Sequence, residues 1–272
     1  MGIIRVIGPR ASGKTTYLAA LAYWPEGRGK ENKSSYFKIQ PIDDDTKNLV
    51  NKAENIICQG EQLEATPVKG GIHEMPLYSF VIEVNLRFQP RKTIALTVRD
   101  YPGEIFDDLL ELNAIHQPFI DECLMPDVDG CLILLSEWQR GQDKIYRRVF
   151  EKFINLMETQ GRSNNLRLAI AMSKCERGEL WPGRIEPDLD IFAQHFPETK
   201  QLLKNSLPAQ NLEFFALSTF GVLRRTDPRP NRVNDANNII KSALRKPDNW
   251  QPYGMIAPIY WLSTGKKMKR DA

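Results

Sequence analysis

An octapeptide near the start of the chain has the residue types and spacing of a phosphate-binding loop. Residues 8–15 read Gly-Pro-Arg-Ala-Ser-Gly-Lys-Thr, which fits the pattern G-x-x-x-x-G-K-[ST]. Gly8 and Gly13 permit backbone angles that a Cβ would forbid, so successive N–H groups can turn inward around a phosphate. Lys14 supplies a positive charge for the β- and γ-phosphates, and Thr15 supplies a hydroxyl ligand for Mg²⁺.

The residues around this loop favour the same interpretation. Residues 3–7 are a β-branched run suited to a buried strand, and residues 16–22 are good helix formers. The order strand, loop, helix is what a phosphate-binding loop requires, because the positive end of the helix faces the anion. Ser12 and Thr16 belong to the expected nucleotide contacts. The alternative is a glycine-containing turn that binds no ligand.

A second motif follows a second predicted strand, residues 93–98. It reads Asp100-Tyr101-Pro102-Gly103-Glu104 and has the form D-x-x-G. A carboxylate at the end of a strand next to a phosphate-binding loop can hold Mg²⁺, often through a water. The backbone N–H of Gly103 can reach a γ-phosphate. The pair therefore predicts a device that senses whether this phosphate is present.

The order of these motifs resembles the Ras-like (TRAFAC) class of P-loop GTPases. The resemblance covers about residues 2–245 and implies GTP or GDP and Mg²⁺ as ligands. The class reads its base with an N/T-K-x-D motif, and Ser173-Lys174-Cys175-Glu176 stands in that place here. The resemblance implies that Lys174 lies along the purine and that Glu176 accepts hydrogen bonds from guanine N1 and N2. Ser replaces Asn and Glu replaces Asp, and an ordinary polar loop is the alternative.

Two further site elements come from the same resemblance. Ser218 and Thr219 match a short loop whose backbone lies behind the base. The class also uses a threonine ahead of its second strand to bind Mg²⁺ and cover the γ-phosphate. Thr66 is the candidate, and Thr46 is its rival, although Thr46 fits better at the start of a helix. A threonine without a functional role is the alternative at Thr66.

Two residues bear on the rate of hydrolysis. Ras-like enzymes often carry a glutamine after the D-x-x-G glycine to orient the attacking water, and this chain has Glu104 instead. Arg10 stands in the middle of the phosphate loop. It could act as an arginine finger from within the chain, block a partner's finger, or face solvent, and the solvent-facing reading is favoured. We expect slow intrinsic hydrolysis, with Lys14, Thr66, Gly103, Glu104 and Arg10 as the candidate catalytic residues.

A narrower resemblance rests on three strings, which are residues 8–21, Asp-Tyr-Pro-Gly-Glu at 100–104 and Pro-Ile-Tyr-Trp-Leu at 258–262. These look like the bacterial double-GTPase (DO-GTPase) proteins. Such proteins are thought to act as switches beside larger effector or conflict-system proteins. The resemblance therefore implies a protein effector and, as a further partner, a GTPase-activating protein.

Strands that alternate with helices predict an α/β fold of the P-loop NTPase type. We expect a three-layer sandwich with a mostly parallel six-stranded sheet that contains one antiparallel hairpin strand. The expected organisation is a Ras-like domain over residues 1–245 with an insertion at about 25–76, an aromatic segment at 246–265 packed on it, and a basic tail at 266–272. Helices are predicted at 46–58, 104–122, 142–159, 188–207 and 233–244. Strands are predicted at 77–88, 130–135, 166–172 and 212–217.

Composition excludes several other classes. The chain has 272 residues, 42% hydrophobic and 26% charged, as in an ordinary globular protein. Its net charge of +3 is carried by residues 266–272, so the rest is formally neutral and a broad nucleic-acid-binding face is not expected. No apolar run approaches the ~20 residues of a membrane span. Four cysteines without C-x-x-C spacing and a start that leads directly into a strand favour a reduced, cytoplasmic protein.

Two other functions stay open at this level. One is an ATP-dependent P-loop enzyme, such as a small-molecule kinase, with an acceptor pocket built from residues 25–76 and Asp100 as base. The other is a binding module that does not hydrolyse nucleotide. Glu104 and Arg10 are the features that support this alternative. The sequence leaves the effector and the oligomeric state undetermined.

Overall fold

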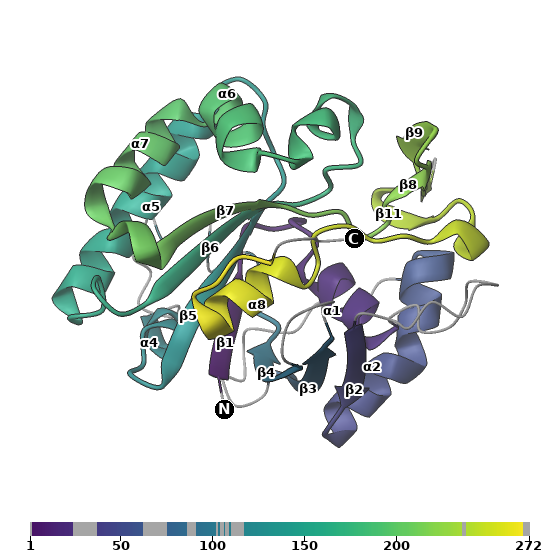
Figure 1. The fold of residues 1–272 in the computed structure, drawn as a ribbon, viewed down its shortest axis with the longest axis horizontal. Coiled ribbons are helices and arrows are strands. Elements are labelled where there is room, and N and C mark those ends of the chain that lie inside the picture. Colours follow the sequence, from purple (N-terminus) through teal and green to yellow (C-terminus); the bar gives the residue numbers. More distant parts are fainter. Residues whose placement is uncertain are drawn as a thin grey trace.

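The computed structural model describes residues 2–23, 37–61, 75–85, 91–101, 103, 106, 109, 117–235 and 238–268. Its centre is a seven-stranded sheet of order β2-β3-β4-β1-β5-β6-β7 (Figure 1). The strands are β1 (Gly2–Ile7), β2 (Phe37–Pro41), β3 (Leu77–Val84), β4 (Lys92–Arg99), β5 (Val128–Leu135), β6 (Arg167–Met172) and β7 (Leu212–Ala216).

Only β3 runs against the direction of the other strands. It pairs antiparallel with both β2 and β4, while β1, β4, β5, β6 and β7 pair in parallel. The sheet is therefore mostly parallel with one antiparallel hairpin strand, as predicted. The predicted number of six strands is wrong, because β2 adds a seventh at the edge. Its five residues contain a proline and only one fully buried side chain, which is a weak strand signal in the sequence.

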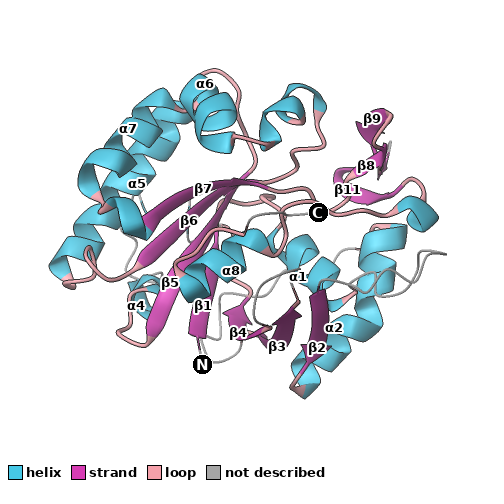
Figure 2. Ribbon diagram, viewed as in Figure 1, coloured by secondary structure: helices cyan, strands magenta, loops and turns pink. Residues whose placement is uncertain are grey.

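Helices cover both faces of the sheet, which gives the expected three layers (Figure 2). Helices α1 (Lys14–Ala22) and α8 (Ala257–Thr264) share one core with the sheet. Helices α4 (Gln117–Cys123), α5 (Gln142–Thr159) and α7 (Pro197–Ser206) bury their apolar sides in a second core on the opposite face. The short α6 (Ala193–His195) precedes α7, and the two are separated at Phe196 next to Pro197.

Helix α2 (Asp44–Glu54) lies beside the β2 edge and continues as a single π-helical turn, Asn55–Gln59. Its start follows from its cap, because the Asp43 carboxylate accepts hydrogen bonds from the backbone N–H and the hydroxyl of Thr46, at 2.7 and 2.6 Å. The hydroxyl of Thr46 also accepts a hydrogen bond from the N–H of Ser79 at 2.7 Å. Thr46 is thus a structural residue that ties α2 to β3.

The predicted helix at 233–244 is wrong, because the chain forms a hairpin there. Strands β10 (Arg232–Asp235) and β11 (Asn238–Leu244) pair antiparallel, next to a smaller hairpin of β8 (Val222–Arg224) and β9 (Asp227–Pro230). Asparagine and aspartate around the turn favour a hairpin over a helix. Buried Asn231 closes the base of the hairpin, since its side chain bonds the backbone O and N–H of Lys246 at 3.0 and 2.8 Å.

The C-terminal aromatic residues pack inward in the described part of the chain. Trp250, Ile259, Tyr260, Trp261 and Leu262 are all buried. The Leu262 side chain also leaves no room for a Cβ at Gly130 of β5. Helix α8 therefore lies directly on the centre of the sheet. None of the helices in the described part of the chain has the length and apolar character that a bilayer span requires.

Candidate functional site

The predicted site residues gather where the parallel strands end. Five loops meet at the carboxyl ends of β1, β4, β5, β6 and β7, and this edge is where open α/β sheets bind ligands. The first loop, between β1 and α1, is residues 8–13. Gly8, Ala11 and Gly13 have φ values of +153°, +60° and +91°. A Cβ at Gly8 would lie 2.3 Å from the backbone oxygen of Leu134, so only glycine fits there.

Helix α1 begins directly at the end of this loop. Gly13 is its N-cap and provides no side-chain hydrogen bond, so the first N–H groups of the helix are left for another acceptor. The Lys14 ammonium folds back along the loop and donates to the backbone oxygens of Gly8 and Pro9, at 2.8 and 3.1 Å. The arrangement places a cation and a helix N-terminus together, which suits a phosphate. Thr16 follows on α1 and is half-buried.

Thr15 and Asp100 make the closest contact between the two nucleotide motifs. Asp100 bridges to Val6 at the end of β4, and its Oδ2 accepts a hydrogen bond from the Thr15 hydroxyl at 2.7 Å. Burial raises the pKa of Asp100, and the Thr15 hydrogen bond and the Lys14 charge oppose this rise. The structure thus joins two residues that are 85 positions apart in the sequence.

This pair fits magnesium by the chemistry of its donors. A hydroxyl and a carboxylate are hard oxygen ligands, and Mg²⁺ is usually held by one or two such groups together with phosphates and water. Among the residues that the structure describes, no group of three His, Cys, Asp or Glu side chains could form a metal site made of protein ligands alone. Thr15 and Asp100 supply two protein donors, the number that Mg²⁺ usually takes when phosphates and water provide the rest.

Gly103 lies against the backbone of the phosphate loop. A Cβ at this position would be 2.3 Å from Cα and 2.4 Å from N of Arg10, so no side chain fits between the two motifs. Arg10 itself is exposed at the surface of the loop. The backbone of Gly103 therefore packs directly against the backbone of the phosphate loop. Thr66 and Glu104 lie outside the described residues.

The loop after β6 leans on the phosphate loop. The Ser173 hydroxyl lies 2.7 Å from the backbone O of Ser12, and the Lys174 ammonium donates to that of Ala11 at 2.6 Å. Lys174 has a φ of +57°, a strained value for a non-glycine residue. Burial, and next the charge of Arg232, lower its pKa to about 8.

Glu176 is the most enclosed charged residue of this edge. Its side chain has no exposed surface, and its Oε2 accepts a hydrogen bond from the Ser218 hydroxyl at 2.6 Å. Its Oε1 accepts no hydrogen bond and faces Nη1 of Arg232 at 3.5 Å. The sequence does not indicate Arg232, because it predicts a helix directly after this arginine, at 233–244, and not the hairpin that brings Arg232 to Glu176.

Ser218 and Thr219 are joined to the C-terminal segment. The backbone of Ser218 exchanges hydrogen bonds with that of Tyr253, at 2.8 and 2.9 Å. The backbone O of Thr219 accepts from the Trp250 indole at 2.8 Å, while its hydroxyl points toward the sulfur of Met255. The structure therefore brings Ser218 to Glu176 and turns the side chain of Thr219 into the core.

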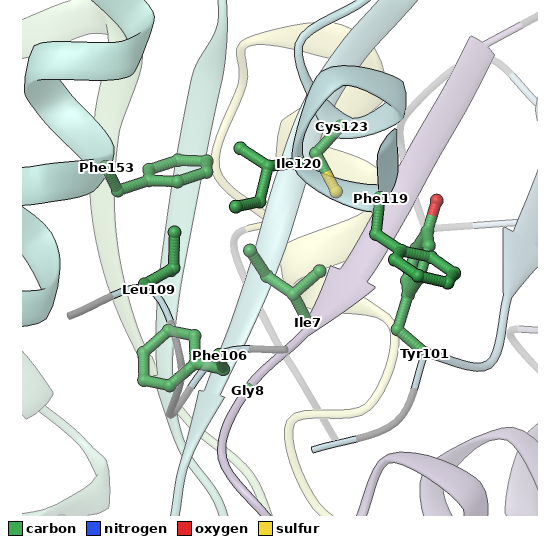
Figure 3. A pocket seen from close by; sticks show the side chains of 9 residues that line it. All are labelled: Ile7, Gly8, Tyr101, Phe106, Leu109, Phe119, Ile120, Cys123 and Phe153. Atoms are coloured by element: carbon green, nitrogen blue, oxygen red, sulfur yellow. The ribbon is translucent and has the colours of Figure 1, made fainter. Parts of the chain in front are cut away.

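An apolar pocket lies behind the phosphate loop (Figure 3). Ile7 and Gly8 line it where β1 runs into the phosphate loop, and Tyr101, Phe106 and Leu109 enter from the chain that follows β4. Side chains of α4 and α5, which are Phe119, Ile120, Cys123 and Phe153, complete the lining. Apart from the Tyr101 hydroxyl and the Cys123 thiol, the described side chains that line the pocket are apolar, and Tyr101, Phe106 and Leu109 belong to the core on this face of the sheet.

One of the comparisons with known proteins matches a family. The model of the Double-GTPase 1 family matches residues 5–172, which is more than half of the chain. Among solved structures, the signal recognition particle receptor SRb-GTP/SRX complex from Chaetomium thermophilum aligns with 98% of this chain and 99% of the other. The sequence identity is 13% and the TM-score is 0.44. The comparison with curated proteins gives no match.

Proposed function

Because the chain belongs to the Double-GTPase 1 family, we propose that it is a molecular switch that hydrolyses GTP slowly, depends on Mg²⁺, and signals to a protein effector in the cytoplasm. Membership of the family makes it a GTPase that binds GTP and GDP. The observation that carries the proposal is the contact of Thr15 with Asp100, because it unites the phosphate loop with the end of β4 in an arrangement that suits a magnesium–nucleotide complex.

In the proposed reaction, water attacks the γ-phosphate in line and the protein contributes mainly position and charge. The residues of the phosphate loop and Lys14 hold the phosphates. Thr15 and Asp100 would hold Mg²⁺, with Thr66 as the proposed third ligand, and the ion would supply positive charge beside the phosphates. Glu104 replaces the usual glutamine and is a poor group to orient water beside anionic oxygens, which supports slow turnover without a partner.

The base would be read by the loop after β6. Glu176 can accept hydrogen bonds from guanine N1 and N2, and adenine offers no such pair of donors on that edge. Lys174 lies between this loop and the phosphate loop, which suits a side chain that passes along a purine. Guanine is thus the base that this loop suits best.

The switch would act through residues 59–76 and 100–112. A γ-phosphate contacted by Gly103 and Thr66 orders both segments, and hydrolysis releases them. Gly103 packs against Arg10 of the phosphate loop, so a displacement of this glycine would change the packing of the loop. An effector that binds only the ordered segments would then read the nucleotide state.

The test is a titration of the protein with fluorescent GDP and ADP, with and without Mg²⁺, for the wild type and for Glu176→Ala. We expect tight GDP binding that Mg²⁺ strengthens and that the substitution weakens by about tenfold or more. Preference for ADP, or GDP binding that is insensitive to Glu176, would contradict the proposal and favour an ATP-dependent phosphotransfer. Tight GTP binding without phosphate release would favour the non-hydrolysing module.

A further inference from the structure

One carboxylate oxygen of Glu176, Oε1, faces the side chain of Arg232. Ser218 satisfies Oε2, whereas Oε1 accepts no hydrogen bond although the side chain is fully buried. A buried carboxylate oxygen without a hydrogen bond is unfavourable and calls for a donor. The group that faces it is the guanidinium of Arg232, at 3.5 Å. This distance is too long for a well-formed hydrogen bond, so the contact is electrostatic.

Arg232 and guanine present the same chemistry to a carboxylate. A guanidinium is planar and carries a fork of N–H donors. The N1–H and 2-amino groups of guanine sit on one carbon and form a similar planar pair. The Arg232 guanidinium also lies over the ring of Phe220, 5.8 Å from its centre. Its position beside Glu176 is therefore one that a guanine edge could take.

Hydrogen bonds connect Ser218 and Arg232, the two residues whose side chains face the Glu176 carboxylate. The Ser218 hydroxyl accepts a hydrogen bond from the N–H of Gly221 at 2.8 Å. The oxygen of Gly221 in turn accepts one from the N–H of Asn231 at 3.0 Å, directly before Arg232. The two groups that face the Glu176 carboxylate are thus carried by one continuous network, and only the Arg232 side chain, at 12% exposure, reaches toward the surface.

The Arg232 side chain also makes a hydrogen bond within the β10–β11 hairpin. Its Nε donates to the hydroxyl of Ser242 on β11 at 2.8 Å. A Cβ at Gly60, at the end of the π-helical turn, would lie 3.3 Å from the backbone O of Ser242, so the hairpin also touches the segment that precedes residues 62–74. The hairpin thus contacts the Arg232 guanidinium through Nε, an atom other than the Nη1 that faces Glu176.

We propose that Arg232 is an internal competitor for the guanine-reading edge of Glu176 and thereby helps to determine which nucleotides bind. The proposal rests on the proposed function, in which Glu176 reads the base. A base must replace the cation beside Oε1. Guanine does so with two donors, whereas adenine offers one donor and a ring nitrogen whose lone pair the carboxylate repels. A base of the wrong type therefore leaves the arginine in place.

The test compares GDP binding by the wild type, Arg232→Met, Glu176→Gln and the double variant, with association followed by stopped-flow fluorescence. Arg232→Met is expected to lower the dissociation constant of GDP by about tenfold, mostly through faster association, because the competing contact is gone. It should leave the binding of inorganic pyrophosphate unchanged. In the Glu176→Gln background the same change should have little effect, since the carboxylate that holds Arg232 is absent.

Arg229→Met is the matched control. Arg229 pairs with Asp227 at 2.7 Å at the surface of the neighbouring hairpin, so its loss should not alter GDP binding. Unchanged or weaker GDP binding by Arg232→Met overturns the proposal and makes Arg232 a support of the site. If Arg232→Met does not fold, Arg232→Gln takes its place, because it also removes the cation beside Glu176, and GDP binding tighter than that of the wild type is then required. If Glu176→Gln leaves GDP binding intact, the reading of guanine itself fails, whatever Arg232 does.

Discussion

The hydroxyl of Thr15 donates a hydrogen bond of 2.7 Å to the carboxylate of Asp100. Thr15 belongs to the first turn of α1 and Asp100 directly follows β4, so the contact joins the phosphate loop to the D-x-x-G motif. Asp100 is buried, its carboxylate accepts the Thr15 hydrogen bond, and the charge of Lys14 acts on it. Such a fixed oxygen pair can receive a metal without rearrangement of the backbone.

Asp100→Asn tests the metal role of this pair. The amide keeps the shape of the side chain and removes its charge, so we expect the effect of Mg²⁺ on GDP affinity to shrink and GTP hydrolysis to fall by about 10². Titration of GDP with and without Mg²⁺, together with single-turnover phosphate release, checks both expectations. Asp129→Asn, at an exposed position of β5, is the control and should behave as the wild type. An undiminished response of Asp100→Asn to Mg²⁺ would exclude Asp100 as a metal residue.

Gly103→Ala tests the contact between the D-x-x-G motif and the phosphate loop. An added Cβ collides with the backbone of Arg10, so Gly103 must move away from the loop and from a γ-phosphate. We expect GDP binding to persist and GTP hydrolysis to fall by about 10². Gly161→Ala is the control, because Gly161 has a positive φ of +67° but open space around it. Equal hydrolysis by Gly103→Ala and the wild type would contradict the sensing role.

Lys174 predicts how folding stability depends on pH. Burial lowers its pKa to about 8, against 10.5 for an ordinary lysine. Between these two values the unfolded chain binds more protons than the folded one, so this group makes stability rise with pH. Below pH 8, Lys174 is protonated in both the folded and the unfolded chain. The cost of burying its charge then lowers the free energy of unfolding by its full amount. Lys174→Met should therefore flatten the rise in stability between about pH 8 and 10.5.

Urea unfolding across this pH range measures the effect as the difference between variant and wild type. Lys144→Met, at an exposed position of α5, is the control and should retain the wild-type pH dependence. A Lys174→Met variant whose stability rises with pH as steeply as that of the wild type would show that Lys174 keeps an ordinary pKa in the folded protein.

Ile259→Ala tests whether α8 is part of the folded core. The Ile259 side chain is fully buried against the sheet, so its truncation should lower the free energy of unfolding by about 2–5 kcal/mol. Ile185→Ala is the comparison, because Ile185 is 66% exposed and its truncation should change stability by no more than ~0.5 kcal/mol. Equal effects of the two substitutions would mean that α8 unfolds separately from the domain.

Local patterns in the sequence predicted most of the sheet and its connections. The loop at 8–15 lies between a strand and a helix as expected, and α5 has the predicted bounds of residues 142 and 159. Apolar runs such as 130–135 lie in buried parallel strands because only such strands are covered on both faces. The family match confirms the resemblance to the double-GTPase proteins.

The elements that sequence reasoning missed depend on partners far away in the chain. Strand β2 exists because β3 offers a free edge, and the β10–β11 hairpin forms where Asn231 closes its base, although its residues also suit a helix. The hydrophobic periodicity of a ten-residue window cannot reveal such partners, because the hydrogen bonds that decide between helix and strand join distant segments.

The sequence by itself determined which groups are proposed to bind phosphate and metal, since the phosphate loop and the D-x-x-G motif are local strings whose glycines, lysine and carboxylate have few other uses. Tertiary structure alone decided what faces those groups. It placed Asp100 on Thr15 across 85 positions, and it set Arg232 of a late hairpin against the buried carboxylate of Glu176. The physical reason is that burial and charge pairing are properties of the packed sheet edge, where loops from five strands meet, and no single segment contains them.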